Sequence, residues 1–294
     1  MAGVHERCAP SSTKGKTMLT TTVDGLWVLQ VLSGIEVLAP ELGLRPHLPR
    51  VETPAMALAH PIAGDLRAAG AIDAADTVDE TVREWLTVLS RRDTALLLHV
   101  NSPASDREPD RVLLARFSQW WVGLERHGIQ VRLSGIGTAT SEQTAGQLIN
   151  SVLERLCGSM SPAEFRPLTL DVAELLAAVR DREELRAFLL DLRLDGDQIA
   201  ALTIAADRER SAQASIVAIQ SGDPGGPSWS HVERATVTII DTPQGRMVSE
   251  QTVRDGRSWM IVSPGTMGTI SSAVVAMMRN LPSNEQWYSY RKVV

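Results

Sequence analysis

Apolar and polar positions follow two spacings along this chain, and the spacings occur in the same order twice. Stretches with an apolar residue every three or four positions predict helices, and alternating stretches predict strands. Each half therefore contains a short strand, helices, four consecutive strands and a final helix. The predicted helices are residues 24–34, 56–69, 80–89, 141–156, 171–180, 183–192, 196–205 and 267–281. The predicted strands are residues 19–22, 94–100, 111–117, 120–126, 129–134, 168–170, 212–220, 234–241, 246–253 and 257–263, and residues 287–294 are expected to add an edge strand.

The turns between these strands recur in the same way. His127-Gly128 ends one four-strand meander and Asp255-Gly256 ends the other, and such X-Gly pairs are typical of tight hairpins. The offset between the halves grows from 214 − 95 = 119 at the first strand to 256 − 128 = 128 at this turn. Insertions therefore fall in loops, as a duplication would leave them. We predict an α/β fold of the α+β type, with an internal duplication and two antiparallel meanders. Residues 18–158 form its N-terminal half and residues 159–294 its C-terminal half.

Composition favours a folded protein of the cytoplasm. The chain has 294 residues, 44% of them hydrophobic, and a net charge of −6. A nucleic-acid-binding protein would need a concentrated basic surface. Cys8 and Cys157 are too few for a disulfide framework. No apolar run approaches the ~20 residues that span a bilayer. Residues 1–17 lack the apolar segment of a secretory signal, so we expect a disordered extension there and take Met18 as the expected functional start.

No group of residues points to catalysis or to a bound cofactor. Lys14-Gly15-Lys16-Thr17 resembles the end of a phosphate-binding loop, but Pro10 stands where that motif requires glycine. Gly135-Ile136-Gly137 is followed by Thr140 where a dinucleotide fingerprint has its third glycine. None of the six histidines has a carboxylate or cysteine at the spacing that places metal ligands on one helix face. We therefore expect no cofactor, no metal and no enzymatic activity.

Two features favour a protein-binding role. Trp120 and Trp121 are adjacent in a predicted strand, so their side chains point to opposite faces of the sheet. One indole is expected under helices. The other is either covered by a further helix or part of a partner-binding surface, and the sequence leaves open which residue faces out. The loop between the first two meander strands is rich in charge, although it could be only a mobile hairpin connection. Its charged residues are Asp106, Arg107, Glu108, Asp110 and Arg111.

Several segments resemble the EspG family, the cytosolic PE/PPE-specific chaperones of mycobacterial type VII (ESX) secretion. The similarity is dense in the first helix and the loop after it, and it continues in the first meander and at the chain end. It covers about residues 18–294. The segments are Leu19-Thr20-Thr21-Thr22-Val23-Asp24-Gly25-Leu26-Trp27, Pro40-Glu41-Leu42-Gly43, Val82-Arg83-Glu84-Trp85-Leu86, Ala115-Arg116-Phe117-Ser118-Gln119-Trp120-Trp121-Val122, Ser263-Pro264-Gly265-Thr266 and Trp287-Tyr288-Ser289-Tyr290-Arg291.

The resemblance implies a quasi-two-fold fold whose meanders form a central sheet between two helical bundles. It also implies a function: binding the tip of the PPE subunit in a PE–PPE heterodimer, which keeps the pair soluble and directs it to a secretion system. The contact regions would be residues 101–111, the open sheet face and the helices of residues 171–206. The partner-binding residues expected in these regions are Asn101, Asp106, Arg107, Glu108, Asp110, Arg111, Trp120, Trp121, Arg193, Asp195 and Asp197.

Two other classes of function stay open at this stage. The open sheet faces of two copies could pair in a structural homodimer without PE–PPE clients. An enzyme with a site between the halves is the third hypothesis, which a bound ligand or a cluster of perturbed carboxylates would favour. The free chaperone is expected to be a monomer or a weak homodimer that binds neither nucleic acid nor membrane.

Overall fold

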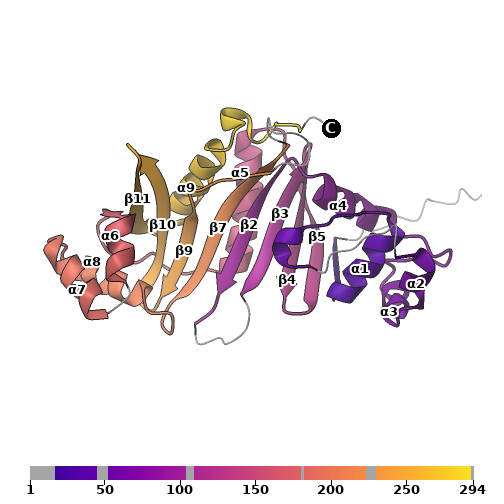
Figure 1. The fold of residues 1–294 in the computed structure, drawn as a ribbon, viewed down its shortest axis with the longest axis horizontal. Coiled ribbons are helices and arrows are strands. Elements are labelled where there is room, and N and C mark those ends of the chain that lie inside the picture. Colours follow the sequence, from indigo (N-terminus) through magenta and orange to yellow (C-terminus); the bar gives the residue numbers. More distant parts are fainter. Residues whose placement is uncertain (1–16, 45–51, 104–108, 180–181, 223–229, 293–294) are drawn as a thin grey trace, which may run out of the picture.

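A computed structural model describes residues 17–44, 52–103, 109–179, 182–222 and 230–292. In these residues ten strands form one continuous antiparallel sheet in the order β1-β5-β4-β3-β2-β7-β9-β10-β11-β6, and β8 pairs with β7 beside this path (Figure 1). The strands are β1 (Met18–Thr22), β2 (Thr94–Asn101), β3 (Asp110–Phe117), β4 (Trp120–His127), β5 (Gln130–Thr138), β6 (Leu168–Asp171), β7 (Ala212–Ser221), β8 (Ser230–Val232), β9 (Val237–Thr242), β10 (Gly245–Arg254) and β11 (Arg257–Pro264).

The strand order confirms the predicted duplication at the level of topology. The first strands of the two meanders, β2 and β7, pair at the centre, with Leu97 opposite Val217. Outward from this pair, the first half runs β3, β4, β5 and β1, and the second runs β9, β10, β11 and β6. The strand that precedes each meander in sequence therefore closes that half on its outer edge. A pseudo-two-fold axis between β2 and β7 therefore relates the strands of the first half to those of the second.

Helices cover both faces of the sheet. One face carries a bundle in each half: α1 to α4 pack on the first meander and α6 to α8 on the second, at the two ends of the view in Figure 1. The other face carries α5 and α9, which meet Leu96 and Leu98 of β2 and Ile216 of β7 in one core. The helices are α1 (Val23–Leu32), α2 (Pro54–Ala59), α3 (Ile62–Ala68), α4 (Glu80–Arg91), α5 (Glu142–Cys157), α6 (Val172–Ala178), α7 (Arg182–Asp191), α8 (Gly196–Ala205) and α9 (Met267–Arg279), with short 3-10 turns η1 (Pro40–Leu42) and η2 (Asn284–Gln286).

Polar caps fix where most of these helices begin. The side chains of Ser141, Asp171 and Asp195 accept hydrogen bonds from backbone N–H groups in the first turns of α5, α6 and α8, which satisfies donors that a helix start leaves unpaired. The helix predicted over residues 24–34 begins at Val23 and ends at Leu32. Its N-cap is Thr22, whose side chain accepts from the N–H of Gly25, because β1 runs directly into α1.

Three other predictions need correction. The helix predicted over residues 56–69 is two helices, α2 and α3, separated at His60 and Pro61, because a proline ring disfavours helical backbone in the residue before it. Residues 287–292 do not form an edge strand: a 3-10 turn precedes Trp287, whose side chain is fully buried. The turn after β4 is Gly128-Ile129 rather than His127-Gly128, because His127 still pairs with Gln130.

Candidate functional site

The centre of the sheet has one covered face and one open face. On β2 and β7 the side chains that point toward α5 and α9, such as Leu98 and Ile216, are buried. Side chains of the opposite face, such as Ser215 and Val217, are partly exposed. Figure 1 shows these strands with no helix in front of them, between the two bundles. We call this surface the central open face; it consists of Leu97, His99, Asn101, Arg111, Gln213, Ser215, Val217 and Thr238.

A row of polar side chains crosses the central open face. Arg111 of β3 lies opposite His99 of β2, and His99 lies opposite Ser215 of β7. The hydroxyl oxygens of Ser215 and Thr238 are 3.2 Å apart. Burial, and then the positive charge of Arg111, lowers the pKa of His99 below its usual value. At neutral pH His99 is therefore uncharged, and Arg111 supplies the positive charge of the row.

The two ends of the charged loop between β2 and β3 lie at an edge of the central open face. Asn101 at the end of β2 is exposed, and Asp110 and Arg111 at the start of β3 are half-buried. Asp110 holds His127 of the neighbouring hairpin, with 2.9 Å between the carboxylate oxygen and Nδ1. Of the five charged residues predicted for the loop, Asp106, Arg107 and Glu108 lie outside the described residues.

The two tryptophans do point to opposite faces, as predicted. Trp121 is 2% exposed and packs in the core under α5 and α9, so it cannot contact a partner, and its inclusion among the binding residues is wrong. Trp120 is 53% exposed and lies on the side of α4. It is opposite Phe117 at one end of the β3–β4 pair, whereas Arg111 and Arg126 face each other at the other end. Six residues of strand span roughly 20 Å, so Trp120 lies apart from the central open face.

The charged residues predicted near α8 have local partners. Asp195 caps α8, accepting from the N–H of Gln198, and its carboxylate lies 3.4 Å from Arg166. Asp197 is exposed in the first turn of α8. Arg193 is exposed in the turn before it, with a positive φ of 53°. Asp195 therefore has a structural role, while Arg193 and Asp197 present charge to solvent.

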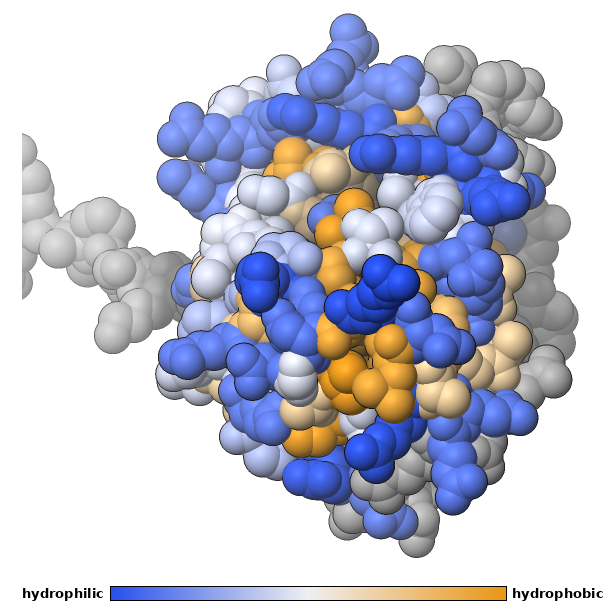
Figure 2. Space-filling view, turned by 90° about the vertical axis from the view of Figure 1, so that its left-hand side faces the viewer, coloured by the Kyte–Doolittle hydropathy of each residue, from blue (hydrophilic) through white to orange (hydrophobic). Residues whose placement is uncertain are grey.

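Apolar side chains are exposed on the same bundle. Figure 2, which faces this end of the molecule, shows apolar residues gathered in the middle and framed by polar ones. Large exposed apolar residues in α6, in α7 and just after them are Leu176, Val179, Leu190 and Leu192, which are 39–62% exposed. Contiguous apolar surface of this kind is typical of protein-binding sites. Both regions were expected as contacts from the resemblance, but residues such as Leu176, His99 and Ser215 were not singled out. The sequence pattern alone does not show which side chains of a helix or strand are left uncovered.

The described residues contain no group of three or more His, Cys, Asp or Glu side chains arranged to hold a metal ion. Among their helices, none combines the length and the apolar character that crossing a membrane requires.

Comparison with known proteins gives consistent matches over almost the whole chain. The ESX-2 secretion-associated protein EspG2 of Mycobacterium tuberculosis (strain CDC 1551 / Oshkosh) is 51% identical over 280 residues, which cover 94% of this chain and 100% of the relative. The ESX-5 secretion-associated protein EspG5 of Mycobacterium marinum is 29% identical over 306 residues, covering 95% and 98%.

Among solved structures, the fold matches Mycobacterium tuberculosis EspG5, a type VII secretion system chaperone solved in complex with the PE25–PPE41 dimer. The TM-score is 0.74 at 24% identity, covering 93% of this chain and 100% of that one. The model of the EspG family matches residues 22–276. A match over this much of the sequence shows that the chain belongs to the EspG family.

Proposed function

We propose that this protein is a cytosolic chaperone of type VII secretion, which binds the PPE tip of PE–PPE heterodimers, keeps them soluble and directs them to an ESX system. Family membership and the names of the relatives support this role. The observation that carries it is the shared fold with EspG5, a chaperone solved with its PE–PPE dimer bound. The protein needs neither cofactor nor catalytic group for such a role.

The proposed contact surface is the central open face together with α6 to α8 and the charged loop. The exposed apolar residues of α6 and α7, Leu176 and Leu190 among them, supply an apolar anchor, and the row at His99 and Ser215 on the central open face supplies polar contacts. Interfaces of releasable partners combine a small apolar centre with polar contacts around it. A chaperone must give up its client, so such a mixed surface suits the role better than a continuous apolar core.

Charge would then select among related clients. Asp110, Arg111, Arg193 and Asp197 are charged and reach solvent at the borders of the proposed surface. Complementary charge discriminates between partners more than it adds affinity, because like charges brought together cost free energy. Because the EspG2 relative is much more similar in sequence than the EspG5 relative, we propose a client of the ESX-2 type.

Co-expression with candidate PE–PPE pairs, followed by pull-down and light scattering, tests the function. Light scattering of the protein alone also tests the homodimer hypothesis, since pairing of open faces would double the mass. We expect one-to-one capture of a cognate PE–PPE dimer by the wild-type chain. Failure to capture any pair, together with a stable homodimer, would refute the chaperone proposal in favour of the homodimer.

A steric variant tests the surface. Ser215→Trp places a large side chain in the middle of the central open face, and Ser258→Trp makes the same change at an exposed position on β11. We expect Ser215→Trp to abolish capture and Ser258→Trp to preserve it, with both variants folded by circular dichroism. Equal capture by both variants would exclude the central open face as the contact.

The loop is tested separately. Replacing Asp106, Arg107, Glu108 and Asp110 with a Gly/Ser linker is expected to leave the fold intact, because surface loops bury little apolar area and the Asp110–His127 pair is a surface ion pair of small energy. Client affinity should fall by ~1–3 kcal/mol through lost charge pairs and preorganisation, roughly a ten- to hundredfold rise in Kd. Unchanged affinity, measured by titration calorimetry, would remove the loop from the contact and leave α6 to α8.

A further inference from the structure

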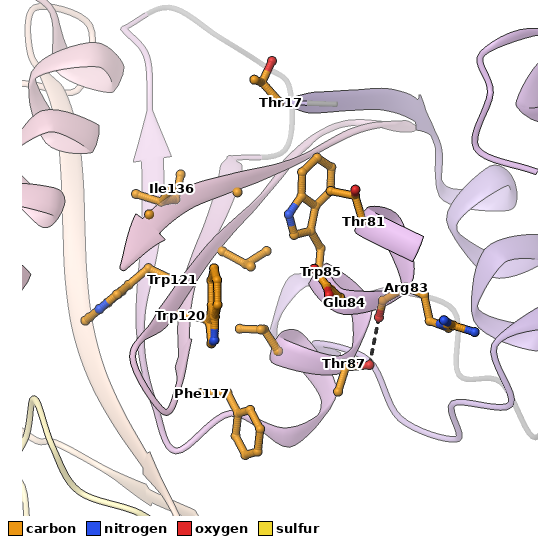
Figure 3. A pocket seen from close by; sticks show the side chains of 14 residues that line it. Thr17, Thr81, Arg83, Glu84, Trp85, Thr87, Phe117, Trp120, Trp121 and Ile136 are labelled. Carbon is orange, nitrogen blue, oxygen red and sulfur yellow. Dashed lines mark hydrogen bonds between the residues drawn. The ribbon is translucent and has the colours of Figure 1, made fainter. Parts of the chain in front are cut away.

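An apolar pocket opens beside Trp120, in the first half of the molecule. Its volume is about 570 Å³, within the range of pockets that hold ligands. Trp85 and Val88 of α4 form one wall, and Phe117, Trp120 and the end of the β4–β5 pair form the other (Figure 3). Trp120 is 53% exposed, and Trp85 lies across the cavity from it. An uncovered indole that borders an apolar cavity indicates a place for a further apolar group.

In the second half, the residue that corresponds to Trp120 is Met247. Both strands end at a two-residue hairpin turn, β4 after His127 and β10 after Arg254. Trp120 lies 127 − 120 = 7 residues before that end, and Met247 lies 254 − 247 = 7 residues before it. Both side chains are on the sheet face that carries the bundles, because Trp120 lines the pocket with α4 and Met247 packs against α8. Met247 is nevertheless fully buried, whereas Trp120 is half exposed.

The cover over Met247 comes from the chain just before β6. The N–H of Arg246 donates to the carbonyl of Ser161 at 2.8 Å, and the N–H of Ala163 donates to the carbonyl of Arg246 at 2.9 Å. Ala163 is 3% exposed and lies in one cluster with Met247 and two alanines of α8. This short segment therefore closes the second half over the counterpart of Trp120.

The matching segment of the first half is the chain just before β1. β1 corresponds to β6, because each pairs with the last strand of its meander and runs directly into a helix. Thr17, the first described residue, already lines the pocket (Figure 3). Residues 1–16 lie outside the described part of the chain, and they are joined to the rim of the cavity through Thr17.

A proline stands at almost the same place before both strands. Buried Leu19 of β1 and buried Leu170 of β6 hold matching positions, since each pairs three residues after its partner strand begins. Pro162 precedes Leu170 by 170 − 162 = 8 residues, and it is the residue that lies beside Arg246 in the covering segment. Pro10 precedes Leu19 by 19 − 10 = 9 residues. The residues around Pro10 are thus at the right distance along the chain to cover the pocket.

The charge of the pocket agrees with this occupant. The two charged residues that line it, Arg83 and Glu84, have opposite signs, so the pocket favours neither an acidic nor a basic ligand. Residues 8–13 are Cys, Ala, Pro, Ser, Ser and Thr, which are uncharged and small. An extended segment of such residues can enter an apolar cavity without burying an unpaired charge.

We propose that residues 8–13 of this chain occupy the pocket and cover Trp120, as residues 161–163 cover Met247. The sequence alone predicts a disordered extension here, because these residues have no apolar pattern, and the comparison of the two halves is what gives them a place. The pocket lies at the opposite end of β3 and β4 from the charged loop. The N-terminal segment therefore closes the first half of the molecule and leaves the central open face free for a client.

A double-mutant cycle on the melting temperature tests the proposal. Deletion of residues 2–16 should lower the melting temperature by about 2–5 °C, because it uncovers apolar surface on Trp120. Trp120→Ala should lower it by about 2–5 °C more in the full-length chain than in the deleted chain, where the indole has no such cover to lose. The matched control is Ile129→Ala, at an exposed apolar position in the β4–β5 turn, which should have the same effect in both chains.

Cysteine cross-linking locates the segment directly. In a Cys8→Ser/Cys157→Ser background, Ser11→Cys is combined with Thr87→Cys on the α4 wall of the pocket. A short bifunctional maleimide should join these two cysteines, and mass spectrometry of the digested protein detects the joined peptides. Ser11→Cys combined with Ser258→Cys, at an exposed position of β11, is the control and should give no cross-link.

Other outcomes overturn the proposal. Additive effects of the deletion and Trp120→Ala would refute it, and so would a Thr87→Cys cross-link no stronger than the control. Concentration-dependent dimerisation that Trp120→Ala abolishes would assign the pocket to a second copy of the chain. Loss of PE–PPE capture with Trp120→Ala but not with the deletion would assign the pocket to the client.

Discussion

Replacing Asp93 is expected to remove the hydrogen bond and the ion pair that hold the C-terminal tail against the sheet. The Asp93 side chain is 1% exposed and accepts from the N–H of Ser118 at 2.8 Å and from the N–H of Lys292 at 3.1 Å. Arg116, also fully buried, donates to Thr94, to the carbonyl of Ser118 and to the carbonyl of Tyr290. Burial, partly offset by Asp93, lowers the pKa of Arg116 to about 10. Asp93→Ala would leave this guanidinium buried without its counter-charge.

Breaking a buried ion pair on one side costs about 3–5 kcal/mol. Unfolding entropy is about 2.1 cal/mol/K per residue, roughly 0.6 kcal/mol/K for this chain, so the melting temperature should fall by about 5–8 °C. Differential scanning calorimetry measures the fall. The double variant Asp93→Asn/Arg116→Met removes both charges and should be more stable than Asp93→Ala, because no unpaired charge stays buried. A fall of less than about 2 °C, or a double variant no more stable than Asp93→Ala, would refute this account.

Three further predictions concern stability and reactivity. The hydrogen bond from Arg279 lowers the pKa of Glu142 below its usual 4.5. The ionised Glu142 therefore stabilises the fold above pH 4.5, and this contribution is lost as the pH falls through the lower folded-state pKa. In thermal melts, the stability of Glu142→Gln should depend less on acid pH than that of the wild type. Trp287→Ala removes a fully buried indole that donates to Glu142 at 2.9 Å, and denaturant unfolding should report a loss of about 3–5 kcal/mol, with Trp287→Phe losing less. Burial raises the pKa of the Cys157 thiol. In a Cys8→Ser background, iodoacetamide should therefore alkylate Cys157 at neutral pH more slowly than it alkylates a free thiol. A rate equal to that of free cysteine would contradict this.

The repeat could be predicted from the sequence because strand order follows from local signals. Alternation marks each strand, and Asp255-Gly256 marks the hairpin that both residues form with positive φ, 52° and 75°, as a two-residue primed turn requires. A meander needs only such neighbouring pairings. The outer pairings, β1 with β5 and β6 with β11, join segments that are far apart in the sequence. In the first half the separation exceeds a hundred residues, and no local sequence pattern indicates such a pairing.

The candidate surfaces were harder to predict, because they depend on what covers a residue. Trp120 and Trp121 have the same type and neighbouring positions, and only the placement of α5 and α9 makes one buried and the other exposed. Asp195 was selected for its charge, yet its carboxylate is engaged in capping α8. The tail shows the same limit: Trp287–Tyr290 has the aromatic content of a strand, but tertiary packing of Trp287 on α5 and α9 decides its conformation.

The short outer strands have a consequence for solubility. A long antiparallel sheet exposes unpaired backbone groups along its two outer edges, and such edges are templates for uncontrolled growth into aggregates. In the described chain these edges are β1 and β6, only 5 and 4 residues long, against 10 residues for the central β7. Each offers a newcomer few hydrogen bonds, and each runs at once into a helix. The short edges thus limit the recruitment of other chains, or of further copies of this one, into a growing sheet.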